Sequence, residues 1–134
     1  MPTLVDTNVL LDLATEDPRW MEWSAAHLER AADGAGVAIN PIIYAELSVH
    51  YAAIEDLERA LSAHDFARLP LPWEAAFVAG KAYRRYRRHG GAKRSPLPDF
   101  YIGAHAAVAG LTLLTRDRSR YREYFPKLRI VAPD

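Results

Sequence analysis

At 134 residues, half of them hydrophobic and a quarter charged, the chain has the size and composition of one ordinary globular domain. It contains no cysteine, which excludes a disulfide framework and a zinc site built on thiolates. No apolar run approaches the roughly 20 residues that span a bilayer. A strand expected from about Thr3 leaves no room for a signal peptide, so we expect a cytoplasmic protein.

The formal net charge of zero hides an asymmetry along the chain. Residues 1–60 carry 11 acidic and 3 basic side chains, whereas residues 61–134 carry 6 acidic and 14 basic ones. Such a split indicates an anionic partner for the second half. The alternative is that folding interleaves the two halves into a neutral surface, and the sequence leaves both possibilities open.

The first half of the chain alternates short apolar runs with helical patterns. Two buried strands are expected, the first ending at Val5 and the second covering residues 37–39. An apolar helix or turn is expected to begin at residues 9–11, and helices at residues 20–32, 41–51 and 55–66. Pro41 suits the first turn of its helix, and this helix is apolar almost all round, which predicts that it is buried.

The second half continues the alternation. A connector with room for a short strand spans residues 68–72, and a basic, proline-containing loop spans residues 92–98. Helices are expected at residues 73–88, 99–109 and 118–125, and strands at residues 111–115 and 129–131. Short apolar strands alternating with helices are typical of an α/β sandwich around a parallel sheet. Without an internal repeat or a long linker, residues 1–134 are expected to form one domain.

Four acidic residues fall where such a fold gathers side chains at one edge of its sheet. Asp6 and Asp117 follow expected strands, Glu46 lies on an apolar helix face, and Asp99 begins a helix. Four carboxylates at one edge repel one another unless a cation joins them, and hard divalent cations prefer oxygen ligands. Each residue also has a simpler explanation, as a helix cap for the three aspartates and as a surface residue for Glu46.

Nitrogen ligands are not indicated, because the five histidines lack zinc spacing, and His105 is expected to be a packing residue. A basic stretch lies between residues 81 and 94, with Tyr83 and Tyr86 interleaved. It suits a nucleic-acid backbone, with the two rings available to stack on unpaired bases. The alternative is a solvated helix face whose arginine stems cover apolar neighbours.

Four segments of the chain resemble the ordered acidic motifs of PIN-domain ribonucleases. They are Val5-Asp6-Thr7-Asn8-Val9-Leu10, the Glu46 helix, Pro98-Asp99-Phe100-Tyr101-Ile102-Gly103-Ala104 and Leu114-Thr115-Arg116-Asp117. The resemblance covers residues 3–131, and the small size looks like the toxins of VapBC-type toxin–antitoxin modules. It implies a three-layer α/β/α sandwich around a mainly parallel sheet of four to five strands. Residues 52–95 match no motif, and this region would set the choice of substrate.

The resemblance also implies hydrolysis of RNA phosphodiesters with Mg²⁺ or Mn²⁺. In our assignment Asp6 and Asp99 are catalytic and bind the metal directly, while Glu46 and Asp117 complete the cluster through a second metal or through metal-bound water. Side chains expected to orient water or phosphate beside the cluster are Asn8, Thr115 and Arg116. Side chains expected to bind RNA are Arg84, Arg85, Arg87, Arg88, Lys93 and Arg94.

Two protein partners are implied by the same resemblance, a second copy in a homodimer and a cognate antitoxin that lays a helix or strand into a groove. The aromatic residues proposed for that groove are Trp20, Trp23, Tyr44 and Tyr51. Two other functions remain open. One is a housekeeping RNA-processing or DNA-acting nuclease on the same scaffold. The other is a non-catalytic nucleic-acid-binding module whose carboxylates only cap helices.

Overall fold

The computed structural model describes residues 1–90 and 97–133. In this part of the chain the strands are β1 (Thr3–Val5), β2 (Val37–Ile39), β3 (Phe66–Arg68), β4 (Thr112–Leu114) and β5 (Ile130–Val131). The helices are α1 (Thr7–Ala14), α2 (Met21–Asp33), α3 (Pro41–Ser48), α4 (Ile54–Leu61), α5 (Trp73–Arg88), α6 (Leu97–Ala109) and α7 (Arg118–Tyr124). None of these helices is long and apolar enough to cross a membrane.

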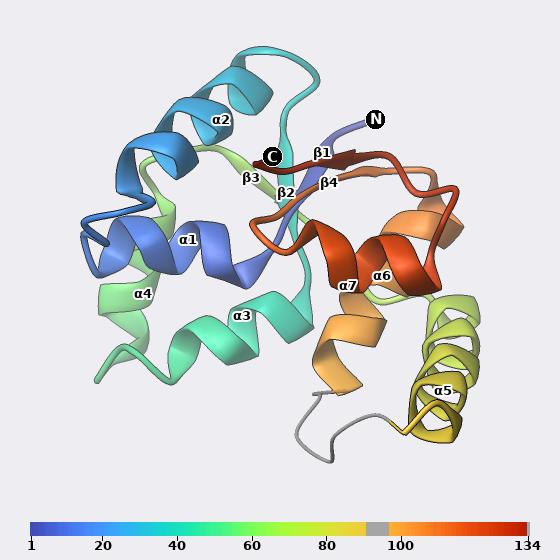
Figure 1. Ribbon diagram of the computed structural model, residues 1–134. Coiled ribbons are helices and arrows are strands. Elements are labelled where there is room, and N and C mark those ends of the chain that lie inside the picture. Colours follow the sequence, from blue (N-terminus) through green and yellow to red (C-terminus); the bar gives the residue numbers. More distant parts are fainter. Residues whose placement is uncertain (91–96, 134) are drawn as a thin grey trace.

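The five strands form one parallel sheet in the order β3-β2-β1-β4-β5. In Figure 1, α1, α2 and α4 lie on one side of the strands and α5, α6 and α7 on the other, with α3 beyond the strand ends. Right-handed crossovers explain this division, because the chain moves from β1 towards β3 and later returns past β1 to β4 and β5. The predicted α/β/α sandwich is confirmed, with the sheet entirely parallel and five strands wide.

The core consists of the strands and the apolar faces of the surrounding helices. Leu4, Val5, Leu113 and Leu114, on the two central strands, are completely or almost completely buried. These short runs are apolar at consecutive positions because both faces of a parallel sheet are covered by helices. The core therefore fixes the central strands, and with them the polar residues that immediately follow.

Local capping explains where two of the helices begin. The Asn40 side chain accepts a 2.9 Å hydrogen bond from the backbone N–H of Ile43, and Pro41 occupies the first turn of α3. Asp6 caps α1 through a 2.8 Å bond from the backbone N–H of Thr7 to its Oδ1. The expectation that α3 is buried all round is wrong: Ile43 and Leu47 are buried but its outer face is not, because only one face packs inward.

Other element boundaries shift by a few residues. The helix expected to reach residue 66 ends at Leu61, and Phe66 instead begins β3, an edge strand that lies before most of the 68–72 connector in which a short strand had room. The helix expected from Asp99 begins two residues earlier, at Leu97. Most of the basic loop expected at 92–98 lies outside the described residues. These shifts leave the positions of the four acidic residues relative to their strands and helices almost unchanged.

The small residues of α6 allow a close approach by the segment around α7. A Cβ atom added at Gly103 would lie 2.5 Å from Cε2 of Phe125 and 2.9 Å from Cδ1 of Tyr121, which is too close for a real contact. Gly103 thus lets the Tyr121 and Phe125 rings sit directly against α6. Because Tyr121 precedes Phe125 on the same turn, this packing holds its hydroxyl at the end of the central strands.

Candidate functional site

The candidate site lies at the carboxyl ends of β1 and β4, where the order of strands along the chain reverses. Asp6 follows β1 and Asp117 follows β4, and the backbone N–H of Asp6 donates a 2.9 Å hydrogen bond to the carbonyl oxygen of Leu114. In open parallel sheets such a reversal opens a crevice beyond the strand ends, and ligands bind there. The sheet topology therefore directs attention to the residues around Asp6.

Asp6 is buried, with 3 % of its surface exposed, and accepts hydrogen bonds on both oxygens. Its Oδ2 accepts 2.7 Å from Oγ1 of Thr115, 3.0 Å from the hydroxyl of Tyr121 and 3.3 Å from Nδ2 of Asn8. Desolvation raises the pKa of Asp6 to about 7, although these donors favour its charged form. The negative charge of Asp99 is a second cause of this rise in the pKa of Asp6.

Glu46 approaches the same crevice from α3. Its Oε1 accepts a 2.6 Å hydrogen bond from the hydroxyl of Thr7, the residue whose backbone N–H donates to Asp6. Partial burial raises the pKa of Glu46, and the charge of Asp99 adds to this rise. The carboxylates of Asp6 and Glu46 are thus connected through Thr7, and the charge of a third carboxylate, Asp99, raises the pKa of both.

Asp99 and Asp117 share a cation. The Nη1 atom of Arg120 donates to Oδ2 of Asp99, and its Nε lies 3.7 Å from Oδ2 of Asp117. Desolvation raises the pKa of Asp99, the Arg120 charge opposes this rise, and the Asp117 charge adds to it. Asp117 also begins α7, where its Oδ1 accepts from the backbone N–H of Arg120 at 3.4 Å. Asp99 therefore interacts electrostatically with the other three carboxylates.

Asn8 and Thr115 lie beside the carboxylates, as expected for groups that orient a ligand. Asn8 donates from Nδ2 to Oγ1 of Thr115 at 3.4 Å and accepts on Oδ1 from the backbone N–H of Arg116 at 3.2 Å. The hydroxyl of Thr115 also accepts from the backbone N–H of Asp117 at 3.0 Å. This network joins the loop after β4 to the end of β1.

The Arg116 guanidinium points to a different partner, which speaks against its expected role in orienting water or phosphate. Its Nε donates a 2.6 Å hydrogen bond to Oδ2 of the buried Asp12, and its guanidinium carbon lies 5.3 Å from the ring centroid of Trp20. Asp12 also accepts 2.6 Å from the hydroxyl of Ser24. Arg116 is drawn to Asp12 because a buried carboxylate needs a charged partner.

The donor chemistry of the site fits a hard divalent cation, since it offers carboxylate and neutral oxygens without thiolates. His105 is not part of it: its buried Nδ1 lies 2.9 Å from Nδ2 of Asn40, and burial lowers the pKa of its imidazole, as expected of a packing residue. Within residues 1–90 and 97–133, no three acidic, histidine or cysteine side chains are arranged closely enough to hold a metal as they stand.

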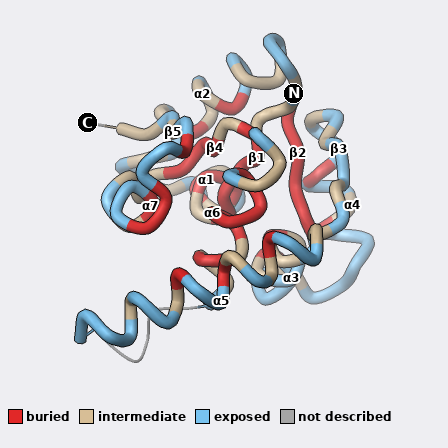
Figure 2. Tube along the Cα trace, turned by 90° about the vertical axis from the view of Figure 1, so that its right-hand side faces the viewer, coloured by how far each residue is buried: buried red, intermediate tan, exposed pale blue. Residues whose placement is uncertain are grey.

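The arginines expected to bind RNA lie on the second half of α5, and Figure 2 shows this end of the helix exposed. Arg84, Arg85, Arg87 and Arg88 are exposed, and none forms an ion pair with another described residue. Arg85 also donates 3.2 Å to the carbonyl oxygen of Tyr124. Lys93 and Arg94 lie outside the described residues.

The tyrosines interleaved with these arginines are half-buried and pack against neighbouring helices. The Tyr83 and Tyr86 rings pack against Phe100 at centroid distances of 5.7 and 5.5 Å, and Tyr86 also contacts Tyr124. They therefore join α5 to α6 and α7. The sequence pattern of alternating basic and aromatic residues reflects helix packing on one face and charge on the other.

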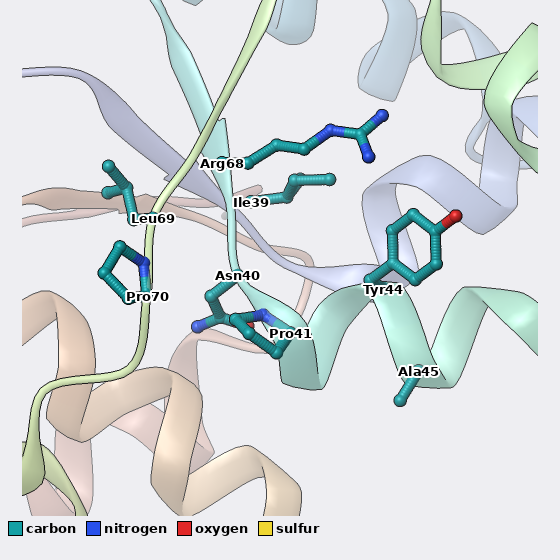
Figure 3. A pocket seen from close by; sticks show the side chains of 8 residues that line it. All are labelled: Ile39, Asn40, Pro41, Tyr44, Ala45, Arg68, Leu69 and Pro70. Carbon is teal, nitrogen blue, oxygen red and sulfur yellow. The ribbon is translucent and has the colours of Figure 1, made fainter.

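The four aromatic residues proposed for a partner groove do not line one surface. Trp20 and Trp23 contact each other, and Trp23 stacks on His27 with centroids 4.1 Å apart. Tyr44 lines a cavity of about 490 Å³ beyond β2 and β3, which Figure 3 shows between α3 and the segment after β3. Tyr51 lines a cleft of about 200 Å³ that is walled by α1, α2, α3 and α4, and Tyr44 and Tyr51 together line another hollow between α3 and α4.

Three contributors to the site were not singled out from the sequence, namely Thr7, Arg120 and Tyr121. Thr7 is adjacent to Asp6, so its position carried a signal, but its contact with Glu46 depends on the packing of α1 against α3. Arg120 and Tyr121 follow Asp117 by three and four residues, which places them on the first turn of α7. Only the phase of that helix decides that both face the carboxylates.

Comparisons with known proteins identify the fold and the family of the chain. No curated protein matches the chain. Solved structures with the same fold include VapBC2 from Rickettsia felis bound to a promoter DNA fragment (20 % identity, 100 % of both chains covered, TM-score 0.74) and a toxin–antitoxin complex from Klebsiella pneumoniae (25 %, 98 % of both chains, 0.68). VapBC-5 from Mycobacterium tuberculosis is 24 % identical over 98 % of both chains, with a TM-score of 0.63. Residues 3–125 match the PIN domain, and the chain therefore belongs to the PIN-domain family.

Proposed function

We propose that this protein is a divalent-metal-dependent endoribonuclease and the toxin of a toxin–antitoxin pair. The observation that supports the proposal is the electrostatic interaction of Asp99 with Asp6, Glu46 and Asp117, four carboxylates from four separate parts of the chain, near the switch point of the sheet. Helix capping alone does not explain it, because Glu46 caps no helix and Asp6 is buried beside another acid. Membership of the PIN-domain family supports a nuclease.

In this proposal Asp6 and Asp99 hold the cation, with Glu46 and Asp117 completing the site. A divalent cation there lowers the pKa of a coordinated water and neutralises charge that develops on the phosphate. Asn8 and Thr115 hold Asp6 in place and present polar groups next to it. Because the pKa of Asp6 is raised to about 7, protons compete with the cation for this carboxylate, so metal affinity should increase with pH.

RNA is proposed as the substrate because exposed positive charge lies on α5, which packs against the helix carrying Asp99. Arginine guanidinium groups bind phosphate oxygens through paired N–H donors. Single-stranded RNA suits such a surface, since its backbone reaches a helix face without unwinding a duplex. Comparing the cleavage of RNA with that of single-stranded DNA tests this choice of substrate.

The decisive experiment compares cleavage of a total-RNA pool and of single-stranded DNA by the wild type, Asp6→Asn and Asp99→Asn. Glu55→Gln, which removes an exposed carboxylate on α4, is the matched control. We expect the wild type and the control to cut RNA with Mg²⁺ or Mn²⁺ and to stop in EDTA, while both aspartate variants fold but lose at least 100-fold in rate. Unchanged cleavage in both variants would refute the carboxylate mechanism. Metal-independent, salt-sensitive binding without cleavage would instead favour the non-catalytic binding module.

The antitoxin is proposed to occupy the cleft between α1, α2, α3 and α4. Its walls are apolar and include Leu10, Leu13, Leu28, Leu47, Tyr51 and Leu61. The similar solved structures from Rickettsia felis and Klebsiella pneumoniae are a VapBC complex and a toxin–antitoxin complex, which supports a partner protein for this chain. An amphipathic helix can place its apolar face in such a cleft. Co-expression with the product of an adjacent small reading frame tests this, with Leu13→Glu expected to abolish co-purification.

A homodimer is proposed through the exposed apolar side chains at the start of α5. Trp73 is 91 % and Phe77 67 % exposed, one helical turn apart and close in sequence to Leu69 and Pro70, which line the cavity in Figure 3. Burying two such rings against an apolar wall is favourable by a few kcal/mol, roughly 1.5–3 per side chain. Light scattering should therefore report a dimer for the wild type and a monomer for Trp73→Ser/Phe77→Ser. A dimeric double variant would place the interface elsewhere.

A further inference from the structure

Arg120 is a cation that the chain itself supplies to the carboxylate cluster. Its guanidinium donates to Asp99 and lies 3.7 Å, between Nε and Oδ2, from Asp117. The Arg120 side chain is 36 % exposed and that of Asp99 20 % exposed, so the pair lies at the mouth of the crevice. The side chain can therefore leave Asp99 without disturbing the core.

The other two carboxylates are stabilised differently. Asp6 accepts from the hydroxyls of Thr115 and Tyr121, and Glu46 accepts from the hydroxyl of Thr7. Among the described residues, neither Asp6 nor Glu46 forms an ion pair. The cluster thus divides into an inner half with neutral donors and an outer half, Asp99 and Asp117, whose charge is compensated by Arg120.

This arrangement places two cations in competition for one carboxylate. A divalent ion carried by Asp6 and Asp99 would draw on the negative charge of the Asp99 carboxylate, whose Oδ2 Arg120 now binds. Arginine remains protonated at all physiological pH values, so it is removed from Asp99 by a stronger positive charge and not by loss of its proton. Once displaced, its planar set of N–H donors remains within reach of a phosphate bound at the same mouth.

We infer that Arg120 occupies the metal-free site as a counter-cation, yields Asp99 to the divalent ion, and then binds a phosphate oxygen of the substrate. The inference rests on the proposed nuclease function. In this succession of events Arg120 first neutralises the metal-free carboxylates, and it positions the substrate only after the divalent cation is bound. Replacing Arg120 should therefore raise the affinity for the divalent cation and lower the cleavage rate.

The test measures Mn²⁺ binding by isothermal titration calorimetry, and separately the cleavage rate, for the wild type, Arg120→Gln and Arg120→Lys. Arg118→Gln is the matched control, because Arg118 is on the same helix but donates to the carbonyl oxygen of Ala132. For Arg120→Gln we expect Mn²⁺ to bind about 2- to 5-fold more tightly, the value of one partly exposed ion pair. Its kcat/KM should fall about 10- to 100-fold, the value of a charged hydrogen bond to phosphate. Arg118→Gln should change neither quantity.

Arg120→Lys retains the charge without the planar donor set, so its Mn²⁺ affinity should stay near that of the wild type while its cleavage rate falls. This variant also serves if Arg120→Gln does not fold. Weaker or unchanged Mn²⁺ binding by Arg120→Gln would overturn the inference, since a residue that only positions Asp99 would have that effect. The calorimetric result can be judged separately from the nuclease proposal. Tighter Mn²⁺ binding by Arg120→Gln, with no RNA cleavage by any variant, would support the competition between Arg120 and the cation but refute the proposed function.

Discussion

The hydroxyl of Thr7 donates a 2.6 Å hydrogen bond to Oε1 of Glu46, although the two residues are 39 positions apart in the sequence. The backbone N–H of the same threonine also donates to Oδ1 of Asp6, the residue that caps α1. Thr7 therefore holds two carboxylates of the proposed site in a fixed relation to each other. The contact joins α1 to α3 and depends on their packing.

Thr7→Val should separate these effects, because valine keeps the shape and the backbone N–H but has no hydroxyl. Leaving Glu46 without this partner is expected to cost about 1–2 kcal/mol of stability, measured by urea unfolding. The RNA cleavage rate should fall about 10-fold, since Glu46 is then free to turn away. Thr7→Ser keeps the hydroxyl and should retain most of the stability and most of the cleavage rate. Equal losses in the serine variant would show that the methyl group, not the hydrogen bond, matters.

The stability of the metal-free protein should decrease between pH 5 and pH 8. Because burial raises the pKa of Asp6 to about 7, the folded state binds its proton more tightly than the unfolded state does. The stabilisation is complete below the unfolded pKa near 4 and is lost as pH rises through about 7, and the raised pKa values of Glu46 and Asp99 act in the same direction.

Denaturant unfolding in EDTA at several pH values measures this slope. Asp6→Asn should flatten it, whatever its effect on the absolute stability, because the amide does not titrate. Adding Mg²⁺ should stabilise the wild type more at pH 8 than at pH 5, since a cation binds the ionised cluster. A wild-type slope that Asp6→Asn leaves unchanged would assign the pH dependence to other groups.

The ion pair between Arg116 and Asp12 should contribute to stability and not to catalysis. Arg116→Met keeps the aliphatic stem against Trp20 but leaves the buried Asp12 without its cation, which we expect to cost about 2–3 kcal/mol by urea unfolding. The Mn²⁺ affinity of the folded variant should stay within about twofold of the wild type, because the guanidinium does not face the carboxylate cluster. A large loss of Mn²⁺ affinity would show that Arg116 contributes to the carboxylate site after all.

The arginines of α5 should bind RNA through attraction to its phosphate charges. Neutralising Arg84 and Arg88 together, as Arg84→Gln/Arg88→Gln, is expected to weaken binding of single-stranded RNA and to reduce the slope of log K against log salt by about 1.4, or about 0.7 per phosphate contact. Asp99→Asn is a suitable background because the RNA is then not cut. Exposed Arg59 on α4, replaced as Arg59→Gln, is the control and should leave the slope unchanged.

The sequence was sufficient wherever a short segment fixes its own structure. The apolar pair Leu4-Val5 followed by Asp6-Thr7 predicts a buried strand and a capped helix, and Asn40-Pro41 predicts the start of α3 by the same local chemistry. Because parallel strands end at a common edge, these local predictions also place Asp6, Glu46, Asp99 and Asp117 near one another. The fold class and the family followed from the same few motifs.

The contacts within the site were decided by the tertiary structure alone. Which face α7 turns towards the crevice depends on the packing of Tyr121 and Phe125 against Gly103, and that packing brings the Tyr121 hydroxyl to Asp6 and Arg120 to Asp99. Arg116, one residue before Asp117, points instead to Asp12, because the buried carboxylate on α1 attracts it more strongly than the mouth of the crevice does. Side-chain direction at the end of a strand is fixed by long-range packing and charge, and the local sequence carries neither.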